Sequence, residues 1–263
     1  MFEQDKKHVF GFDFISNESV ENIAKACIDY TFPKQDPQGQ LPLMITPNAA
    51  QIVMYHHEQA DLKPKVKNAV LILPDGQPIV WTSRLIKQPL KARLTGSDFF
   101  PIFWGLIKGQ QKRAYLILPD NKTATCMHND YEQIKTYVPP FVKLEDTAQF
   151  QVVTDQVVAD ILEFKPDFVL LGLSYPKQEI LSLKAYEQLE NTDIERIPLF
   201  FSLGASYEFY CGMKKRAPKI YQQLGMEWFY RFMQEPRRMW RRYTVDNFRF
   251  LLLMRKEIFK KRK

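Results

Sequence analysis

Short, nearly continuous apolar runs recur along the chain, separated by longer stretches with helical periodicity. The runs are LPLMITPN (41–48), AVLILPDG (69–76), RAYLILPDN (113–121), DFVLLGLSYPKQE (167–179) and IPLFFSLGAS (197–206). Apolar and polar residues do not alternate within them. Each run is therefore typical of a strand that is buried on both faces of a parallel sheet.

The segments between the runs predict helices at 18–30, 49–60, 98–109 and 154–164. Ser16 or Asn17, Ser97 and Thr154 are candidate N-caps. The repeated order of strand and helix predicts a doubly wound α/β domain, with a mostly parallel sheet and helices on both faces.

Polar residues close each apolar run, and the set comprises Thr46, Asn48, Asp75, Asp120, Asn121, Ser174, Lys177 and Gln178. Ligands of open parallel sheets bind outside the carboxyl ends of the strands. Asp-Gly and Pro-Asn also form ordinary turns, and for any single run the turn is the favoured interpretation. Taken together, the runs predict a cleft without naming its ligand.

Composition narrows the class of protein. The chain has 263 residues, of which 45% are hydrophobic, enough for a sizeable core. No apolar run reaches the roughly 18 residues of a membrane span, and the N-terminus does not resemble a signal peptide. Cys27, Cys126 and Cys211 show neither a disulfide framework nor zinc spacing, so we expect a cytosolic chain.

Charge is unevenly distributed. Residues 214–263 hold 16 Lys/Arg and 4 Asp/Glu, a net charge of +12, whereas residues 1–213 carry a net charge of −5. We therefore predict an α/β body at 1–213 and a basic C-terminal appendage at 214–263 that meets an anionic partner. A solvated helical surface is the alternative.

Several familiar motifs are absent from the sequence. It has no G-x-G-x-x-G, no phosphate-binding Gly-Lys-Ser/Thr loop, no G-x-S-x-G and no Asp-x-Asp pair. His56 and His57 are adjacent and would diverge on a helix, so we interpret them, with His8 and His128, as structural or surface residues. We predict no cofactor and no metal site.

An ordered set of motifs gives a resemblance. TPN, LPDGQPIVWTSRL, RLTGSDFF, LGLSYPKQE and LGASYEFYCGMKKRAPKIYQQLGMEWFYRFMQEPRRMWRRY occur in this order. The chain resembles the WecG/TagA/CpsF family of bacterial glycosyltransferases (glycosyltransferase family 26) over about residues 8–243, most densely from 167 onward. The resemblance implies a Rossmann-like body and transfer of an N-acetylmannosamine-type sugar from a UDP-sugar to a polyprenyl-diphosphate-linked sugar. It also implies inversion at the anomeric carbon, independence of divalent metal, and action at the cytoplasmic membrane face in surface polysaccharide synthesis.

The resemblance carries over residue by residue in the body. Asp75 matches the family's proposed general base, which takes the proton of the attacking hydroxyl. Thr46 and Asn48 match positions beside this base, and Arg93 matches an arginine near the pocket. Gln178 matches a residue that contacts the nucleotide-sugar.

Two segments depart from the family pattern. Gln77 and Pro78 follow PDG, where a small residue and then Val or Ile are expected, and the PDNKT loop at 119–123 lacks a Gly-Gly-x-Pro pattern. Tyr207 and Phe209 are interpreted as packing residues. The two departures bear on the identity of the donor sugar rather than on the type of reaction.

The appendage is predicted to be helical, with Ile220, Leu224, Phe229 and Phe232 at helical spacing and Pro236 in the first turn of a second helix. By resemblance, Arg231, Arg238 and Arg241 lie in a segment that folds over the active site. Guanidinium groups suit a diphosphate, of the donor or of the acceptor.

The last segment, NFRFLLLMRKEIFKKRK, places Phe248, Leu251, Leu252, Ile258 and Phe259 roughly on one side among basic residues. This pattern is typical of a helix on an anionic membrane surface. Two alternatives to a transferase are a nucleic-acid-binding protein with a basic aromatic tail and a non-catalytic assembly protein at the membrane. The ordered motifs favour the transferase, with no nucleic-acid partner. They leave open whether it acts as a monomer or a homo-oligomer.

Overall fold

The fold is described from a computed structural model over residues 5–34, 36–215, 217–218, 221, 230, 232–233 and 246–260. A parallel sheet forms its centre, in the order β4-β3-β8-β7-β5-β6. Its strands are β3 (Leu41–Ile45), β4 (Ala69–Ile72), β5 (Ala114–Ile117), β6 (Ile134–Tyr137), β7 (Phe168–Leu171) and β8 (Leu199–Ser202). All but β6 are buried almost along their whole length, as the continuous apolar runs predict.

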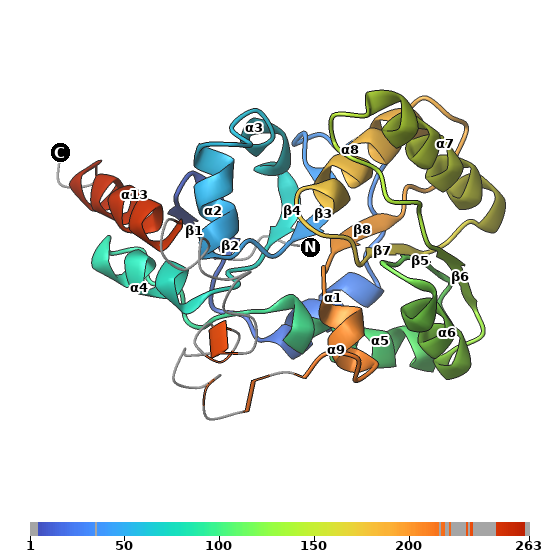
Figure 1. The fold of residues 1–263 in the computed structure, drawn as a ribbon, viewed down its shortest axis with the longest axis horizontal. Coiled ribbons are helices and arrows are strands. Elements are labelled where there is room, and N and C mark those ends of the chain that lie inside the picture. Colours follow the sequence, from blue (N-terminus) through green and yellow to red (C-terminus); the bar gives the residue numbers. More distant parts are fainter. Residues whose placement is uncertain are drawn as a thin grey trace.

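Helices cover both faces of this sheet (Figure 1). Those on one face are α2 (Ala49–His56), α7 (Thr147–Phe164) and α8 (Lys177–Leu189), and those on the other are α1 (Val20–Ile28), α5 (Gly96–Gly109) and α6 (Asn121–Asp130). The other helices in the described part of the chain are α3 (Lys63–Val66), α4 (Gln77–Leu85), α9 (Ser206–Tyr210) and α13 (Asn247–Lys260). The predicted doubly wound, Rossmann-like α/β class is confirmed.

A β-hairpin precedes the sheet. β1 (Lys6–Val9) pairs antiparallel with β2 (Phe12–Ile15) through a turn in which Phe10 and Gly11 both have positive φ. Such two-residue turns match the twist of the strands that they join. Phe12 and Phe14 of this hairpin are fully buried, and they extend the core beyond the edge of the sheet.

The core beneath the sheet is aromatic. Phe103 of α5 lies 4.7 Å from Phe201 of β8 and 5.0 Å from Phe168 of β7, measured between ring centroids. Tilted and edge-on rings at these distances stabilise a core beyond their buried area. This cluster fixes α5 against the middle of the sheet.

The helix starts differ in detail from the sequence predictions. α1 is capped by Ser19 rather than by Ser16 or Asn17, and α5 by Thr95 rather than by Ser97. Thr154 lies inside α7, where its hydroxyl donates to the carbonyl of Phe150, so that helix begins seven residues earlier, at Thr147. In the sequence, a threonine whose hydroxyl bonds to the backbone inside a helix cannot be distinguished from a threonine that caps the helix.

Most of the predicted appendage lies outside the described residues, including Arg231, Arg238 and Arg241. Its last helix, α13, is described. Phe250 and Leu253 are buried against the body, and the ring of Phe250 lies 5.2 Å from that of Phe10. Arg249 pairs with Glu58 at 2.6 Å, so both apolar and ionic contacts hold α13 beside α2. The predicted boundary near residue 213 stays a prediction.

Candidate active site

The carboxyl ends of the strands surround a cleft of about 1120 Å³. Register pairs Ile45 with Ser202 and Leu171 with Ser202, so β3, β8 and β7 end at one level. After β3 the chain turns into α2 on one face, and after β8 it turns into α9, which packs on α5 of the other face. Neighbouring strands whose connections leave to opposite faces define the switch point at which α/β sheets bind ligands.

Backbone pairing continues past the strands and places Asp75 beside the TPN segment. The amide of Asp75 donates to the carbonyl of Pro47 at 3.2 Å, between Thr46 and Asn48. Thr46, Asn48 and Asp75 all line the cleft and are partly buried. The structure therefore brings together three residues that are separated by up to 29 positions in sequence.

Asn48 has a structural task as well. Its side-chain oxygen accepts from the amides of Ala50 and Gln51, and Gln51 bonds back to the amide of Asn48, which forms a capping box at the start of α2. This arrangement satisfies amides that the first turn of a helix leaves unpaired. It also holds the cleft end of α2 in place.

Arg93 belongs to the same neighbourhood but is not part of the cleft lining. The amide of Leu94 donates to the carbonyl of Pro74 at 3.0 Å, which places the Arg93 segment next to Asp75. Two residues later Gly96 and Ser97 do line the cleft, at the start of α5.

Gln178 lines the cleft, yet it is only 3% exposed and both ends of its amide are engaged. Its Oε1 accepts from the amide of Gly204 at 3.0 Å, and its Nε2 donates to Oε1 of Glu179 at 2.9 Å. The side chain thus joins the start of α8 to the turn after β8. The predicted contact with a nucleotide-sugar stays a prediction.

The far side of the cleft is formed by a loop that the sequence did not single out. Pro139, Pro140 and Phe141 follow β6, and Phe141 is 83% exposed. The ammonium group of Lys177 lies 4.4 Å from the centroid of the Phe141 ring. In the sequence, this feature is marked only by an aromatic residue after two prolines, a pattern that is common in surface loops.

Basic side chains border the cleft as well. Lys214 and Lys215 line it a few residues after α9, and Lys214 pairs with Glu208 at 2.8 Å. Asp246 lines it where the chain returns ahead of α13. Lys215 and Asp246, the residues that flank segment 216–245, therefore both line the cleft.

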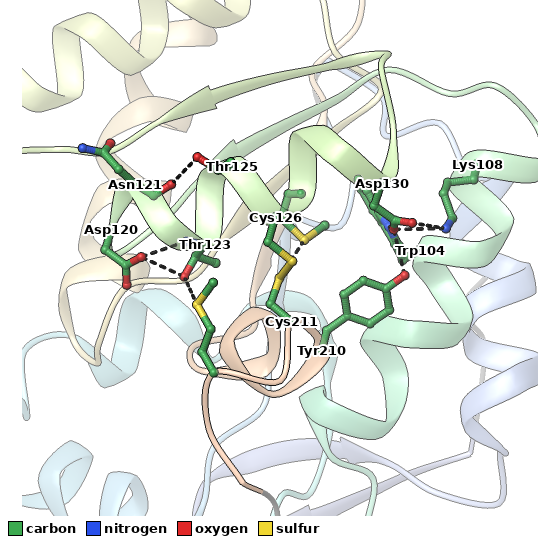
Figure 2. Close-up of a disulfide and its surroundings, with 12 residues drawn as sticks. Trp104, Lys108, Asp120, Asn121, Thr123, Thr125, Cys126, Asp130, Tyr210 and Cys211 are labelled. Atoms are coloured by element: carbon green, nitrogen blue, oxygen red, sulfur yellow. Dashed lines mark hydrogen bonds and ion pairs between the residues drawn. A yellow bond between two sulfur atoms is a disulfide. The ribbon is translucent and has the colours of Figure 1, made fainter.

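Asp120 and Asn121 are strand-end residues that do not belong to the cleft lining. Asp120 caps α6, since its Oδ1 accepts from the amide of Thr123 at 2.8 Å (Figure 2). For this run the ordinary turn interpretation is correct.

A disulfide joins Cys126 of α6 to Cys211, directly after α9 (Figure 2). The sequence indicated no disulfide, because the two cysteines are 85 residues apart and only the fold brings α6 and α9 together. Cys27 is buried with a free thiol, and burial raises its pKa.

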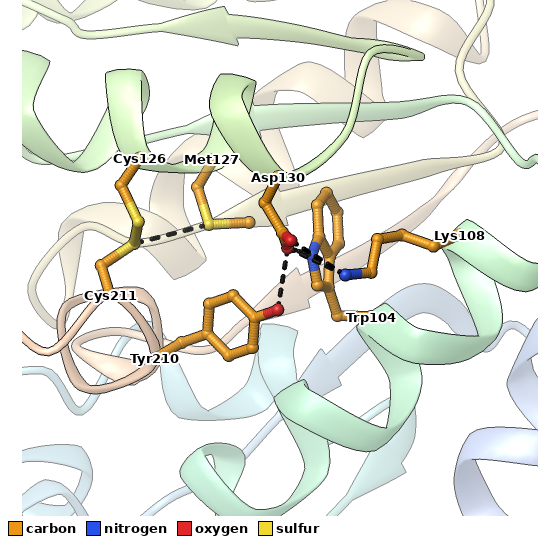
Figure 3. A network of polar contacts seen from close by, with 7 residues as sticks. All are labelled: Trp104, Lys108, Cys126, Met127, Asp130, Tyr210 and Cys211. Atoms are coloured by element: carbon orange, nitrogen blue, oxygen red, sulfur yellow. Dashed lines mark hydrogen bonds and ion pairs between the residues drawn. A yellow bond between two sulfur atoms is a disulfide. The ribbon is translucent and has the colours of Figure 1, made fainter.

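Asp130 ties three helices together near this disulfide (Figure 3). It accepts from Trp104 Nε1 at 2.7 Å, from Lys108 Nζ at 3.0 Å and from the Tyr210 hydroxyl at 2.8 Å. Burial alone would raise the pKa of Asp130, but the hydrogen bonds from Trp104, Tyr210 and Lys108 lower it below its usual value. Together with the disulfide, this network fixes α9, whose residues form one wall of the cleft.

Tyr207 of α9 is fully buried, as its interpretation as a packing residue requires. A Cβ on Gly172 would lie 2.8 Å from the Tyr207 ring, so only glycine allows this close approach after β7. Phe209 is partly buried and also lines the cleft.

The histidines have structural or surface roles. His56 contacts the carbonyl of Phe10 and Nζ of Lys63, and burial and this lysine lower its pKa. His8 pairs with Asp13 and His128 with Thr136 at the surface. Within the described ranges, no three His, Cys, Asp or Glu side chains gather in a way that could hold a metal ion.

The exposed side of α13 is apolar and basic. Phe248, Leu251, Leu252 and Phe259 are 45–64% exposed, whereas Ile258 packs partly against the body. The guanidinium group of Arg255 lies 5.6 Å from the Phe259 ring centroid. None of the helices in the described ranges is both long and apolar enough to span a membrane.

This cleft, with its polar and apolar lining at the switch point of a parallel sheet, places the chain among the α/β proteins that bind their ligands at the carboxyl ends of the strands. The sequence model of the family described as "Glycosyl transferase WecG/TagA/CpsF family" matches residues 9–263. The chain therefore belongs to this family and is a glycosyltransferase.

Curated relatives match almost the whole length of the chain. It is 25% identical over 263 residues to the N-acetylglucosaminyldiphosphoundecaprenol N-acetyl-beta-D-mannosaminyltransferase of Staphylococcus aureus strain MW2, covering 98% of this chain and 96% of that protein. The enzyme of the same name from Staphylococcus aureus strain NCTC 8325 matches with the same identity and coverage.

Proposed function

We propose that the chain transfers an N-acetylmannosamine-type sugar from a UDP-sugar to a sugar linked to polyprenyl diphosphate, with inversion and without a divalent metal. The observation that carries the proposal is the placement of Asp75 beside Thr46 and Asn48 in the cleft, through the hydrogen bond from its amide to Pro47. The names of the Staphylococcus relatives support the transferred sugar and the lipid-linked acceptor.

Asp75 is the proposed general base. The acceptor hydroxyl oxygen attacks the anomeric carbon from the face opposite the nucleotide, and the bond from that carbon to the phosphate oxygen breaks. The carboxylate of Asp75 takes the hydroxyl proton, and UDP leaves with the bonding electron pair. Thr46 and Asn48 supply short polar groups beside the reacting hydroxyl.

Cations of the chain would stabilise the leaving diphosphate. Lys214 and Lys215 line the cleft. Lys215 and Asp246, which flank the segment that carries Arg231, Arg238 and Arg241, also line it. Fixed positive groups at the site where negative charge grows perform the electrostatic task that a metal ion performs in other transferases.

The donor would lie across the strand ends. Neighbouring strands are about 4.8 Å apart, so the end of β7 lies about 14 Å from the end of β4, comparable with the length of an extended nucleotide-sugar. With its anomeric carbon at Asp75, the donor would place its base near Phe141 and Lys177. An exposed ring is a stacking platform for a nucleobase.

The exposed face of α13 would rest on the membrane. It combines apolar side chains with Arg255, Lys256 and Lys260, which suits an anionic lipid surface. We therefore place the enzyme on the cytoplasmic face, as a peripheral protein that reaches a lipid-linked acceptor in surface polysaccharide synthesis.

Release of UDP from UDP-N-acetylmannosamine, with and without a synthetic polyprenyl-diphosphate N-acetylglucosamine, tests the proposal. Release is expected only with the acceptor and is expected to persist in excess chelator. Asp75→Asn is expected to lower kcat by about 10² to 10⁴, the usual contribution of a general base, with an unchanged melting temperature. Failure of the parent enzyme with every UDP-sugar, or parent-like turnover by a folded Asp75→Asn variant, would contradict the proposal.

A further inference from the structure

Glu179 is a buried carboxyl group directly after the cleft residue Gln178. It lies in the first turn of α8 and is only 2% exposed. Oε1 accepts from Gln178 Nε2 at 2.9 Å, and Oε2 has no hydrogen-bond partner among the described residues. Burial raises the pKa of Glu179 to about 7. A carboxyl group held in this way is costly to the fold, and its role needs an explanation.

The contact with Glu179 gives the Gln178 amide one orientation. If the amide were flipped, its NH₂ group would face the amide N–H of Gly204 and its oxygen would face the Glu179 carboxyl. Both contacts would be repulsive when the carboxyl is ionised, since an ionised carboxylate only accepts hydrogen bonds. In the observed orientation both contacts are hydrogen bonds, and the carboxyl offers an acceptor oxygen in either protonation state.

The orientation matters because Gly204 begins a wall of the cleft. Gly204 has a φ of +53° and is followed by Ala205 and Ser206, and all three line the cleft at the switch point. The amide of Gly204 is held by a buried side chain rather than by a neighbouring strand. Its position therefore depends on the Gln178 amide, and through it on Glu179.

We infer that Glu179 is a positioning residue for the donor site: it fixes the Gln178 amide and thereby the Gly204–Ser206 wall. The expected effect on the position of Gly204 rests on geometry alone. The expected effect on kinetics also rests on the proposed function. It also assigns Gln178 an indirect role, because both polar ends of its side chain are used inside the protein.

Three variants test the inference. Glu179→Gln keeps an acceptor oxygen in the same place, whereas Glu179→Met keeps the size and removes the acceptor. Ser182→Ala is the matched control, because Ser182 is also buried on α8 and donates to the backbone carbonyl of Gln178 without touching its amide. Thermal unfolding of all three measures the effect on the fold.

The structural readout is hydrogen exchange at the Gly204 amide, which needs no substrate. Leaving Gln178 Nε2 without its acceptor is expected to raise exchange in Glu179→Met by about tenfold or more, with parent-like exchange in Glu179→Gln and Ser182→Ala. Parent-like exchange in Glu179→Met overturns the inference, whatever the activity of the parent.

The kinetic readout is the KM for the UDP-sugar against kcat. Glu179→Met is expected to raise the KM by about tenfold with a smaller change in kcat, and Glu179→Gln is expected to restore both. Equal kinetic losses in Glu179→Met and Ser182→Ala, or a loss in Glu179→Gln as large as that in Glu179→Met, overturn the inference. An inactive parent with altered Gly204 exchange in Glu179→Met would refute the proposed function alone.

Discussion

At the scale of single residues, two carboxyl groups near the cleft have opposite surroundings. Asp75 is partly buried and faces the cavity, where a base must meet its substrate. Glu179 is buried, its Oε1 accepts from the Gln178 amide, and burial raises its pKa. Environment rather than residue type therefore separates the group that we propose to exchange protons with a ligand from the group that we infer to hold structure.

The raised pKa of Glu179 predicts a dependence of stability on pH. Its folded-state pKa is about 7 and its usual value is 4.5. Between these two pH values the folded state therefore binds more protons at this group than the unfolded state does. Stability from this group therefore falls as pH rises from about 4.5 to about 7, by on the order of 3 kcal/mol, and stays low above. Chemical unfolding of parent and Glu179→Gln at pH 5 and pH 8 measures the difference, which is expected to favour the variant at pH 8. An equal difference at both pH values would contradict the prediction.

The residues show what sequence could and could not supply. Asp75, Thr46 and Asn48 follow apolar runs, and parallel strands carry such positions to one edge, so their meeting was predictable. The engagement of Gln178 was not, since its partner Gly204 is 26 positions away and the bond depends on the path of the turn after β8. Phe141 and the basic pair Lys214 and Lys215 reach the cleft through loops, whose course hydrophobic patterns do not encode.

At the scale of elements, α13 combines two faces of different use. Phe250, Leu253 and Glu257 attach it to the body, the last through a bond from the amide of Phe10 at 3.2 Å. Leu251 and Leu252 point outward. Removing the whole helix would uncover α2, whose first residues line the cleft, so point substitutions separate membrane contact from folding better than a deletion.

Leu251→Ser with Leu252→Ser is expected to weaken binding to anionic liposomes by about a hundredfold or more, because each exposed leucine offers about 1.5–3 kcal/mol of apolar burial and about 1.4 kcal/mol is a factor of ten in affinity. Turnover of a soluble acceptor is expected to be unchanged. Val152→Ser with Leu162→Ser on α7 is the matched control, since these side chains are exposed on a different helix. Flotation of the three proteins decides the matter, and equal recovery of all three with liposomes would refute a membrane role for α13.

The disulfide between α6 and α9 is a second element-scale feature with a measurable effect. Closing a loop between residues 85 positions apart is expected to stabilise the fold by about 2–4 kcal/mol. Reductant, or replacement of Cys126 and Cys211 by Ser, is expected to lower the melting temperature equally. Alkylation of the unfolded, unreduced chain is expected to add one group, at Cys27. Three added groups would show that the pair is reduced, the usual state of cytosolic thiols.

At the scale of the whole molecule, periodicity predicted the class of fold because buried parallel strands have a distinctive apolar pattern. It missed β6, in which only Ile134 is buried, and the helices α4, α6 and α8. The order of strands in the sheet, and with it the switch point between β3 and β8, depends on contacts between distant segments. The sequence therefore predicted that strand ends contribute residues to the site, but not the order in which these strands lie along the cleft.

The two ends of the cleft predict different kinetic defects. Phe141→Ala removes the proposed stacking platform, and base–aromatic stacking contributes about 1–3 kcal/mol, so the KM for the UDP-sugar is expected to rise by about tenfold or more with kcat nearly unchanged. Asp75→Asn is expected to show the reverse, a lower kcat with donor affinity retained. Phe141→Tyr keeps a ring of the same shape and is expected to match the parent, which separates stacking from general disturbance of the loop.

Because Phe141 is 83% exposed, its replacement is expected to leave the melting temperature unchanged. Steady-state kinetics over a range of donor concentrations, with direct titration of UDP, measures both parameters. If Phe141→Ala binds UDP as the parent does, the base lies elsewhere and the donor does not span the strand ends from β4 to β7.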